Sequence, residues 1–432
     1  MRYITSTGSY LTFLIIILSA FFTPHTAEAV PAFARQTGMP CMGCHFQSFP
    51  ALNSFGRNFR AKGYTMQGLQ TMIEGEELSL PSTLNVSVIA KIRSQIKDND
   101  DGNRGEVQWP DEAALLVGGR AADKIGFLME LGLGSGGVDN GDGSLSCTDV
   151  SGNPADALPD LSNCTANTGT GSTNSTFLST KFHFGIGDNF GIIPFSTDGL
   201  GVGYGFELLN TGQQRSQRPI ENRSGYSAAQ LLGTASGEAT GIAFVYETPN
   251  WFINYSHWTP TWGNIHANIF GGLAHYLRAA YTPNLGGWDT GFGVSYMTGS
   301  VKTGKTDPAN EFFVDGWGID LQTQGMAGSM PLGLYASYGV TPKSSATEEN
   351  HYNSSTTDDA TAYGLLAKLE VVSGTSIYLA YSSMDVITST STSTLGAQQM
   401  LAQNVKMELY FADSDSNNLG SDYTMLMLFA GF

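Results

Sequence analysis

The chain has 432 residues and a formal net charge of −17, with 21 Lys and Arg against 38 Asp and Glu. This acidic balance argues against nucleic acid as a partner. Only 14% of the residues are charged, while the chain holds 53 Gly, 24 Phe and 18 Tyr, a composition unlike that of a soluble helical protein of this length.

The N-terminus has the pattern of a secretory signal peptide. Arg2 precedes an apolar run over residues 11–22, and the small residues Ala27 and Ala29 flank Glu28. The apolar run is too short for a membrane-spanning helix. We therefore predict that residues 1–29 are a signal peptide cleaved after Ala29 and that the mature chain is exported.

The pentapeptide Cys41-Met42-Gly43-Cys44-His45 predicts covalent attachment of one haem c. Two thiols at this spacing form thioethers to the two porphyrin vinyl groups, and the histidine that follows binds the iron. The alternatives are a zinc half-site and a redox dithiol. Zinc would need a second pair of ligands, and a redox dithiol would need a strand–helix setting, and the sequence offers neither nearby.

Residues 30–80 are expected to form a small haem c unit. About fifty residues cannot easily bury a core alone, so the porphyrin would supply apolar surface. A stripe at helical spacing could pack on the haem or only on protein: Phe49, Leu52, Phe55 and Phe59. Arg35 and Arg57 could pair with haem propionates or fix the unit as a plug in a barrel.

Several short segments around the pentapeptide carry a family resemblance. They are residues 32–38, Phe49-Pro50, Phe55-Gly56-Arg57 and Lys62-Gly63-Tyr64. Together with the pentapeptide they resemble the N-terminal signature of the fused outer-membrane cytochrome-porins, best known from iron-oxidising bacteria. The resemblance covers about residues 31 to 66. It implies a monohaem cytochrome joined to a porin-like barrel, with extracellular Fe(II) as the electron donor.

The second axial ligand of the iron is expected among the methionines. Met39 and Met42 lie too close to the attachment turn to reach the opposite haem face, whereas Met66 and, less favourably, Met72 follow enough chain to do so. A thioether ligand would raise the reduction potential, which suits a weak reductant such as Fe(II). An open or histidine-filled position remains the alternative.

Beyond residue 80 the chain predicts a mainly β fold, a transmembrane antiparallel barrel of about 16 strands over residues 81–432. Segments of about ten residues with alternating apolar positions follow one another without sustained helical periodicity. The candidate strands are 84–94, 112–121, 126–134, 176–187, 190–197, 200–209, 224–233, 239–248, 251–259, 270–282, 288–298, 311–322, 331–340, 361–371, 376–384, 402–412 and 423–432. These are seventeen, and we expect an even number.

The connections predict the orientation of the barrel. Short turns at 187–189, 248–250, 283–287 and 373–375 are expected on the periplasmic side, and longer polar segments at 135–174, 299–310, 342–360 and 385–401 on the outside. The final strand places Leu426, Leu428 and Ala430 in one lipid-facing row before the terminal Phe432. The pattern predicts the outer membrane of a Gram-negative bacterium.

Cys147 and Cys164 lie in the longest polar segment, and in an exported chain they predict a disulfide that restrains it. A metal role has no support from neighbouring ligands. The sequence identifies no site for extracellular Fe(II).

Two functions of different classes follow. The first is an oxidoreductase that takes single electrons from extracellular Fe(II) through one haem c to a periplasmic c-type cytochrome or similar carrier. The second is a diffusion porin that carries the haem c unit for electron transfer or as a plug, since about sixteen strands can enclose a water-filled pore.

Overall fold

The computed structural model describes the chain from residue 32 onward, apart from several loops. The described residues are 32–75, 79–99, 102–133, 145–147, 164–166, 177–197, 209–212, 219–221, 227–234, 239–260, 272–302, 311–386, 389–402, 404–415 and 422–432. The signal peptide predicted for residues 1–29 lies outside them.

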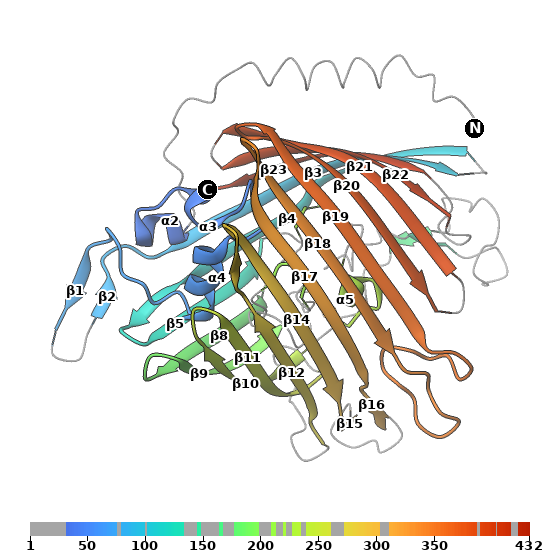
Figure 1. Ribbon diagram of the computed structural model, residues 1–432, viewed down its shortest axis with the longest axis horizontal. Coiled ribbons are helices and arrows are strands. Elements are labelled where there is room, and N and C mark those ends of the chain that lie inside the picture. Colours follow the sequence, from blue (N-terminus) through green and yellow to red (C-terminus); the bar gives the residue numbers. More distant parts are fainter. Residues whose placement is uncertain are drawn as a thin grey trace.

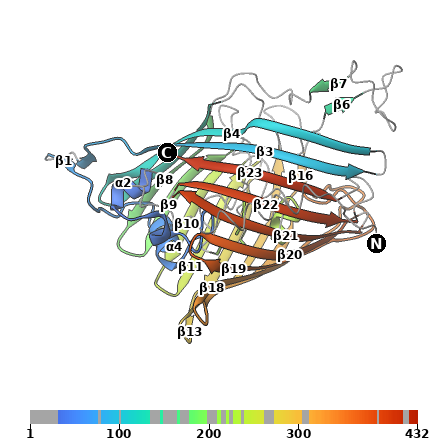
Figure 2. The ribbon, with the colours of Figure 1, turned by 90° about the horizontal axis from the view of Figure 1, so that it is seen from above.

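Sixteen long strands in the described residues close into an antiparallel β-barrel (Figures 1 and 2). They are β3 (Val86–Asn99), β4 (Gly102–Ala122), β5 (Ile125–Gly132), β8 (Phe177–Ile186), β9 (Phe190–Thr197), β10 (Ala239–Glu247), β11 (Trp251–Thr259), β12 (Ala274–Tyr281), β14 (Trp288–Thr298), β17 (Gly316–Ala327), β18 (Met330–Thr341), β19 (Ala360–Val372), β20 (Thr375–Asp385), β21 (Ser389–Ala402), β22 (Val405–Ser414) and β23 (Tyr423–Gly431). The two-residue β13 (Asn284–Leu285) extends the hairpin between β12 and β14. The expected fold class and strand number are confirmed.

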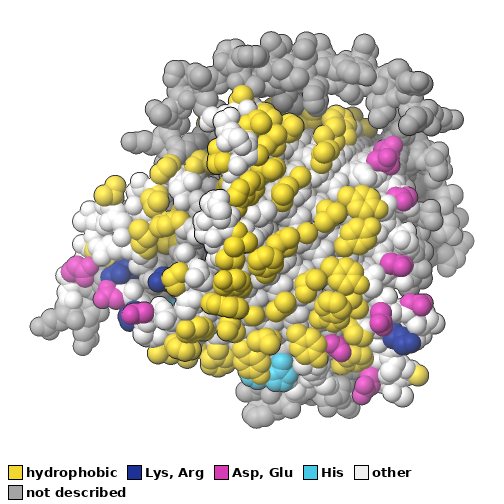
Figure 3. Space-filling model, viewed as in Figure 1, with side chains coloured by type: hydrophobic (Ala, Val, Ile, Leu, Met, Phe, Trp, Pro, Cys, Tyr) yellow, Lys and Arg dark blue, Asp and Glu magenta, His cyan; other side chains and the backbone are white. Residues whose placement is uncertain are grey.

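Alternation along the strands gives the barrel an apolar outside and a more polar inside. In β11, Trp251, Ile253 and Tyr255 are exposed, whereas Asn254 and Ser256 are fully buried. Because successive side chains of a strand point to opposite faces, the exposed set faces outward and the buried set faces the lumen. The outer surface therefore carries a broad apolar field (Figure 3), as expected for a barrel of the outer membrane.

The two ends of the barrel differ. The four short turns predicted for the periplasmic side are all hairpin connections at one end, which we take as the periplasmic end. The last strand, β23, pairs with β22 and with β3 and so closes the barrel. Its predicted lipid-facing row is confirmed, because Leu426 and Leu428 are exposed between fully buried Met425 and Met427.

Two predicted elements are wrong. In its described part, residues 227–233, the predicted strand 224–233 is not a strand: Ser227 caps the short helix α5 (Ala228–Leu231) through a capping box with Gln230, and α5 packs on β18, β19 and β20. The polar segment predicted as a loop at 385–401 contains β21. Most of the strand expected at 200–209 lies outside the described residues, and Leu209 belongs to a turn.

The lumen holds protein from both ends of the barrel. Parts of the connection between β9 and β10 turn inward, and Leu209 and Ile220 on them are fully buried. From the periplasmic side, the N-terminal residues enter as three helices, α2 (Ala32–Thr37), α3 (Cys41–Cys44) and α4 (Ser54–Ala61). We call residues 32–66 the plug. Among the described residues, no helix is long and apolar enough to cross a bilayer.

Three small ribbons complete the described structure. The hairpin of β1 (Met72–Glu74) and β2 (Ser79–Pro81) joins the plug to the barrel and projects from its periplasmic end (Figure 2). Two further ribbons pair β15 (Ser300–Lys302) with β16 (Glu311–Phe313) and β6 (Leu145–Cys147) with β7 (Cys164–Ala166).

Candidate functional site

The pentapeptide predicted to attach haem, Cys41 to His45, forms a single helical turn at the periplasmic mouth. Helix α3 begins after Pro40, and the amide of His45 donates to the carbonyl of Cys41 at 2.9 Å. Both cysteines are free thiols and half-buried. Burial raises the pKa of both thiols, that of Cys44 to about 11, so both are protonated at neutral pH.

His45 is oriented as a metal-binding histidine. Its Nδ1 lies 3.2 Å from the carbonyl oxygen of Ala51. Since a carbonyl only accepts, Nδ1 carries the proton and Nε2 keeps its lone pair for a ligand. Burial lowers the pKa of His45 to about 4, so the ring is neutral. A hydrogen bond from the second nitrogen is the usual support of a ligating histidine, and these residues therefore fit a haem c.

Helix α4 clamps the attachment turn from one side. Asn53 caps the helix by accepting from the amide of Gly56 at 2.9 Å, and its side-chain amide donates to the carbonyl of Gly43 at 3.0 Å. A Cβ on Gly56 would lie only 2.1 Å from the carbonyl oxygen of Cys44. The position therefore requires glycine, and the close packing of α4 fixes the position of Cys44 relative to this helix.

The residues of the predicted apolar stripe make several contacts within the plug and with the lumen. Phe59 contacts the rings of Phe33 and Tyr64 at centroid distances of 5.4 and 5.5 Å, and the amide of Leu52 donates to the side chain of Asn210 in the lumen at 2.8 Å. Phe55 is half-buried.

The fourth member of the stripe, Phe49, links the pentapeptide to the barrel. Its ring lies edge-on to that of His45 at 5.5 Å and stacks on the ring of Phe429 in β23 at 4.9 Å. Phe49 is thus the stripe residue whose ring contacts that of the predicted iron ligand, while Leu52 meets His45 through a backbone bridge.

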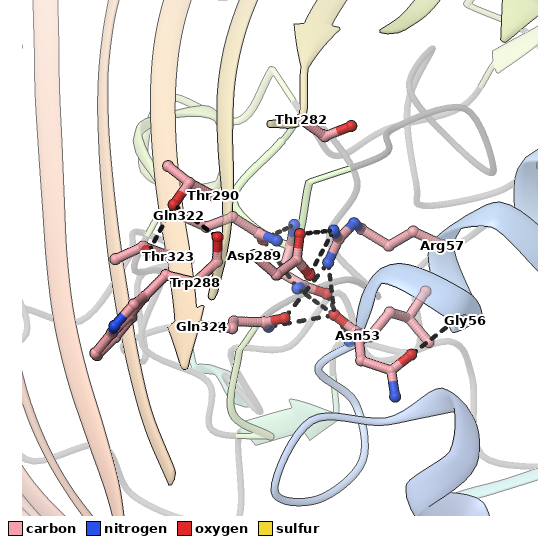
Figure 4. A network of polar contacts seen from close by, with 12 residues as sticks. Asn53, Gly56, Arg57, Thr282, Trp288, Asp289, Thr290, Gln322, Thr323 and Gln324 are labelled. Carbon is pink, nitrogen blue, oxygen red and sulfur yellow. Dashed lines mark hydrogen bonds and ion pairs between the residues drawn. The ribbon is translucent and has the colours of Figure 1, made fainter. Parts of the chain in front are cut away.

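Arg57 fixes the plug to the barrel wall. Its Nη2 donates to both carboxylate oxygens of Asp289 in β14 at 2.7 Å, and its Nη1 donates to the carbonyl of Leu52 at 3.2 Å and to Gln324 of β17 at 3.4 Å. Figure 4 shows this network, with Arg57 reaching from α4 to the two strands. Of the two roles expected for Arg57, the structure places it in the plug contact.

A second anchor follows the attachment site directly. Gln47 donates to the carbonyls of Pro331 and Lys368 at 2.8 and 3.0 Å. The ammonium of Lys368 donates to Ser48 at 2.7 Å, and that of Lys406 donates to the carbonyl of Phe49 at 2.9 Å. Two wall lysines therefore hold the three residues that lie two to four positions beyond His45.

Gln36 forms a third anchor, next to β3 and β4, which lie across the barrel from the strands that hold Arg57. Its amide donates to the carbonyls of Tyr64 and Met66 at 2.6 and 2.8 Å, and its oxygen accepts from Asn85 at 3.0 Å. The side chain of Met66 is 42% exposed, and its role as second axial ligand stays a prediction. Arg35 is half-buried at the end of α2, and burial lowers its pKa.

For the predicted disulfide between Cys147 and Cys164 the structure gives the pairing of the backbone. The register of β6 and β7 places Cys147 directly opposite Cys164, an arrangement that suits the predicted disulfide. Within the described residues, no group of three or more His, Cys, Asp or Glu side chains is arranged to hold a metal ion.

The wall residues of the anchors were not singled out from the sequence. Asp289, Lys368 and Lys406 all lie inside long strands, where charged side chains are rare unless they face a polar lumen or a partner. A charge at an inward position of a strand near a short turn is the signal that could have found them.

Comparisons with known proteins concern the barrel. No protein-family model matches the sequence, and no curated protein matches it either. Among solved structures, a loop-deletion form of OmpT, an outer membrane protein of Vibrio cholerae, is 10% identical with a TM-score of 0.47, covering 81% of this chain and 99% of that one. The outer membrane channel DcaP of Acinetobacter baumannii gives 10% and 0.44, covering 81% and 97%. A porin refined at 1.8 Å gives 15% and 0.43, covering 81% and 100%.

Proposed function

We propose that the protein is an outer-membrane electron-transfer barrel that holds one covalent haem c at its periplasmic mouth and passes single electrons to a periplasmic carrier. The observation that carries the proposal is His45, a neutral imidazole that directly follows two free thiols and whose Nδ1 is bound to the Ala51 carbonyl. When bound, the haem supplies a one-electron redox centre.

The residues of the plug hold and present this centre. Cys41 and Cys44 would bond the porphyrin, His45 would ligate the iron, and Met66 is the candidate second ligand. Met42, inside the attachment turn, is 46% exposed, so the turn is open to solvent on that side. An exposed edge at the periplasmic mouth suits transfer to a soluble c-type cytochrome or similar carrier.

Extracellular Fe(II) is the electron donor in this proposal. The hydrocarbon core of a bilayer, about 30 Å thick, is a long insulating path. A redox centre held inside the barrel shortens the distance that an electron from Fe(II) at the outer mouth must cross. Insoluble ferric product would then form outside the periplasm. The acidic balance of the chain favours the approach of a cation.

A diffusion porin with a haem unit as appendage or plug is the second candidate. Its support is the barrel itself, since sixteen strands enclose enough space for a water-filled channel and the lumen wall is polar. The three anchors of the plug weigh against a wide opening at the periplasmic end.

Two measurements separate the candidates. When the purified ferric protein in detergent is mixed with Fe(II), stopped-flow spectroscopy should show a ferrocytochrome spectrum. This spectrum should appear at a time between the dead time of the instrument and seconds after mixing. His45→Ala, which removes the ligand, should not give this spectrum. Absence of reduction in a protein with an intact haem spectrum would refute Fe(II) oxidation, and a large stable conductance in planar bilayers would then favour the porin.

A further inference from the structure

Two histidines form a pair on the outer surface of the barrel, far from the plug. The register of β11 and β12 places His257 directly opposite His275. Their ring centroids are 4.7 Å apart at an interplanar angle of 68°. Both share the parity of the outward-facing residues of their strands, Tyr255 and Leu277, which are exposed. The pair therefore projects outward, and both rings are half-buried.

The pair lies near the extracellular end of its strands. Strand β11 begins after the periplasmic turn at 248–250, and His257 is two residues before its last residue, Thr259. His275 is the second residue of β12. On the side of β10, Ile242 faces His257, and on the side of β14, Thr298 faces His275. No charged side chain faces the pair from these two neighbouring positions.

One ring of the pair has a fixed orientation. The phenol oxygen of Tyr255 lies 2.9 Å from Nδ1 of His275, and the Tyr255 ring packs edge-on to His257 at 4.9 Å. In the tautomer in which Nδ1–H of His275 donates to the phenol oxygen, Nε2 keeps its lone pair for a ligand. A hydrogen bond at the second nitrogen is how proteins orient a ligating histidine, and the same device holds His45 in the plug.

We propose that His257 and His275 form a surface site for one divalent transition-metal ion that prefers nitrogen ligands, such as Cu(II), Ni(II) or Zn(II). Imidazole suits these ions, and neutral histidine is their commonest protein ligand. Two rings in contact across adjacent strands can chelate one ion with small rotations of their side chains. Within the described residues no third His, Cys, Asp or Glu joins the pair, so the site is proposed on the two imidazoles.

The site is independent of the proposed electron transfer. It lies outside the barrel at the extracellular end, while the pentapeptide lies inside at the periplasmic end. A metal ion would reach this site from the medium or from the polar layer of the outer leaflet.

Titration of the tag-free, haem-loaded protein in detergent with Cu(II) and Zn(II) tests the site. Calorimetry should show a tight binding phase with a stoichiometry of one ion per chain, separate from any weaker phase. Cu(II) electron paramagnetic resonance should show nitrogen hyperfine coupling. His257→Asn or His275→Asn should weaken binding at least tenfold, and Tyr255→Phe should weaken it less, because it removes only the orienting hydrogen bond.

His351 provides the matched control. It is an exposed histidine in the connection between β18 and β19, stacked on Phe312 and edge-on to Tyr352, and His351→Asn should leave the affinity unchanged. Since all these side chains are outside the barrel core, heat-modifiable migration on gels should show that each variant folds. Equal affinity in wild type and both pair variants, or loss only in His351→Asn, would overturn the proposal.

Discussion

The contact of Arg57 with Asp289 should decide whether the plug stays docked. The guanidinium is buried, and both of its bonds to the carboxylate are 2.7 Å long. Removing one partner of a buried ion pair costs about 3–5 kcal/mol. Because the Asp289 side chain is 23% exposed, part of its charge is solvated without the partner, and we expect about 2–3 kcal/mol here.

This cost translates into an opening that can be measured. At about 1.4 kcal/mol for each factor of ten, the undocked fraction of the plug should rise roughly 30- to 150-fold in Arg57→Ala. Single-channel recording in planar bilayers should show more frequent and longer openings than in the wild type. Arg57→Lys keeps the charge but has no second nitrogen for the bonds that Nη1 makes to Leu52 and Gln324, so it should fall between the two.

A double-mutant cycle with Asp289→Ala isolates the pair itself. Asp188→Asn is the matched control, because Asp188 pairs with Lys124 at 3.5 Å on an exposed periplasmic turn, and exposed pairs contribute little. A coupling energy near zero between Arg57 and Asp289, or the same opening frequency in Arg57→Ala and the wild type, would refute this account of docking.

Three further predictions concern the attachment site. Gly56→Ala should reduce the yield of haem-loaded protein and the stability of the plug by about 1–3 kcal/mol, measured by pyridine haemochrome assay and proteolysis, since its Cβ would meet the carbonyl of Cys44; an unchanged yield would contradict the close packing. Lys406→Met removes a positive charge next to Phe49 and should lower the midpoint potential of the haem by about 30–60 mV, which shifts the one-electron redox equilibrium about three- to tenfold. A haem potential that rises or stays constant in spectroelectrochemistry would count against it. In haem-free protein, Cys44 has a pKa of about 11, so its alkylation by iodoacetamide should be slow at pH 7.5 and accelerate about tenfold per pH unit toward pH 10; fast labelling at pH 7.5 would show that the thiol is not buried.

The sequence predicted the strands well where they cross the bilayer and less well where they extend beyond the bilayer. Alternation of apolar residues marked most strands, but the first half of β21, 389–394, is an unbroken run of Ser and Thr, which indicates a loop when read alone. Those residues continue a strand past the apolar field, where no lipid requires apolar side chains. The opposite error occurred at α5, whose apolar residues face the lumen wall rather than lipid.

The candidate site was predictable only in its local part. The pentapeptide and the apolar residues near it follow from short spacings. The partners that hold them, Asp289, Lys368 and Lys406, lie more than two hundred residues away in sequence. No local pattern connects such residues, because barrel closure alone brings them to the same mouth.

The stacking of Phe49 on Phe429 bears on how the protein is assembled. Strand β23 is the last strand of the sequence and closes the barrel against β3, and its lumen side carries the ring on which the plug rests. Contacts of such sequence separation form late in folding. An N-terminal unit completed in the periplasm would thus meet its final partner only as the wall is sealed, so the closing seam and the plug secure one another in a single step.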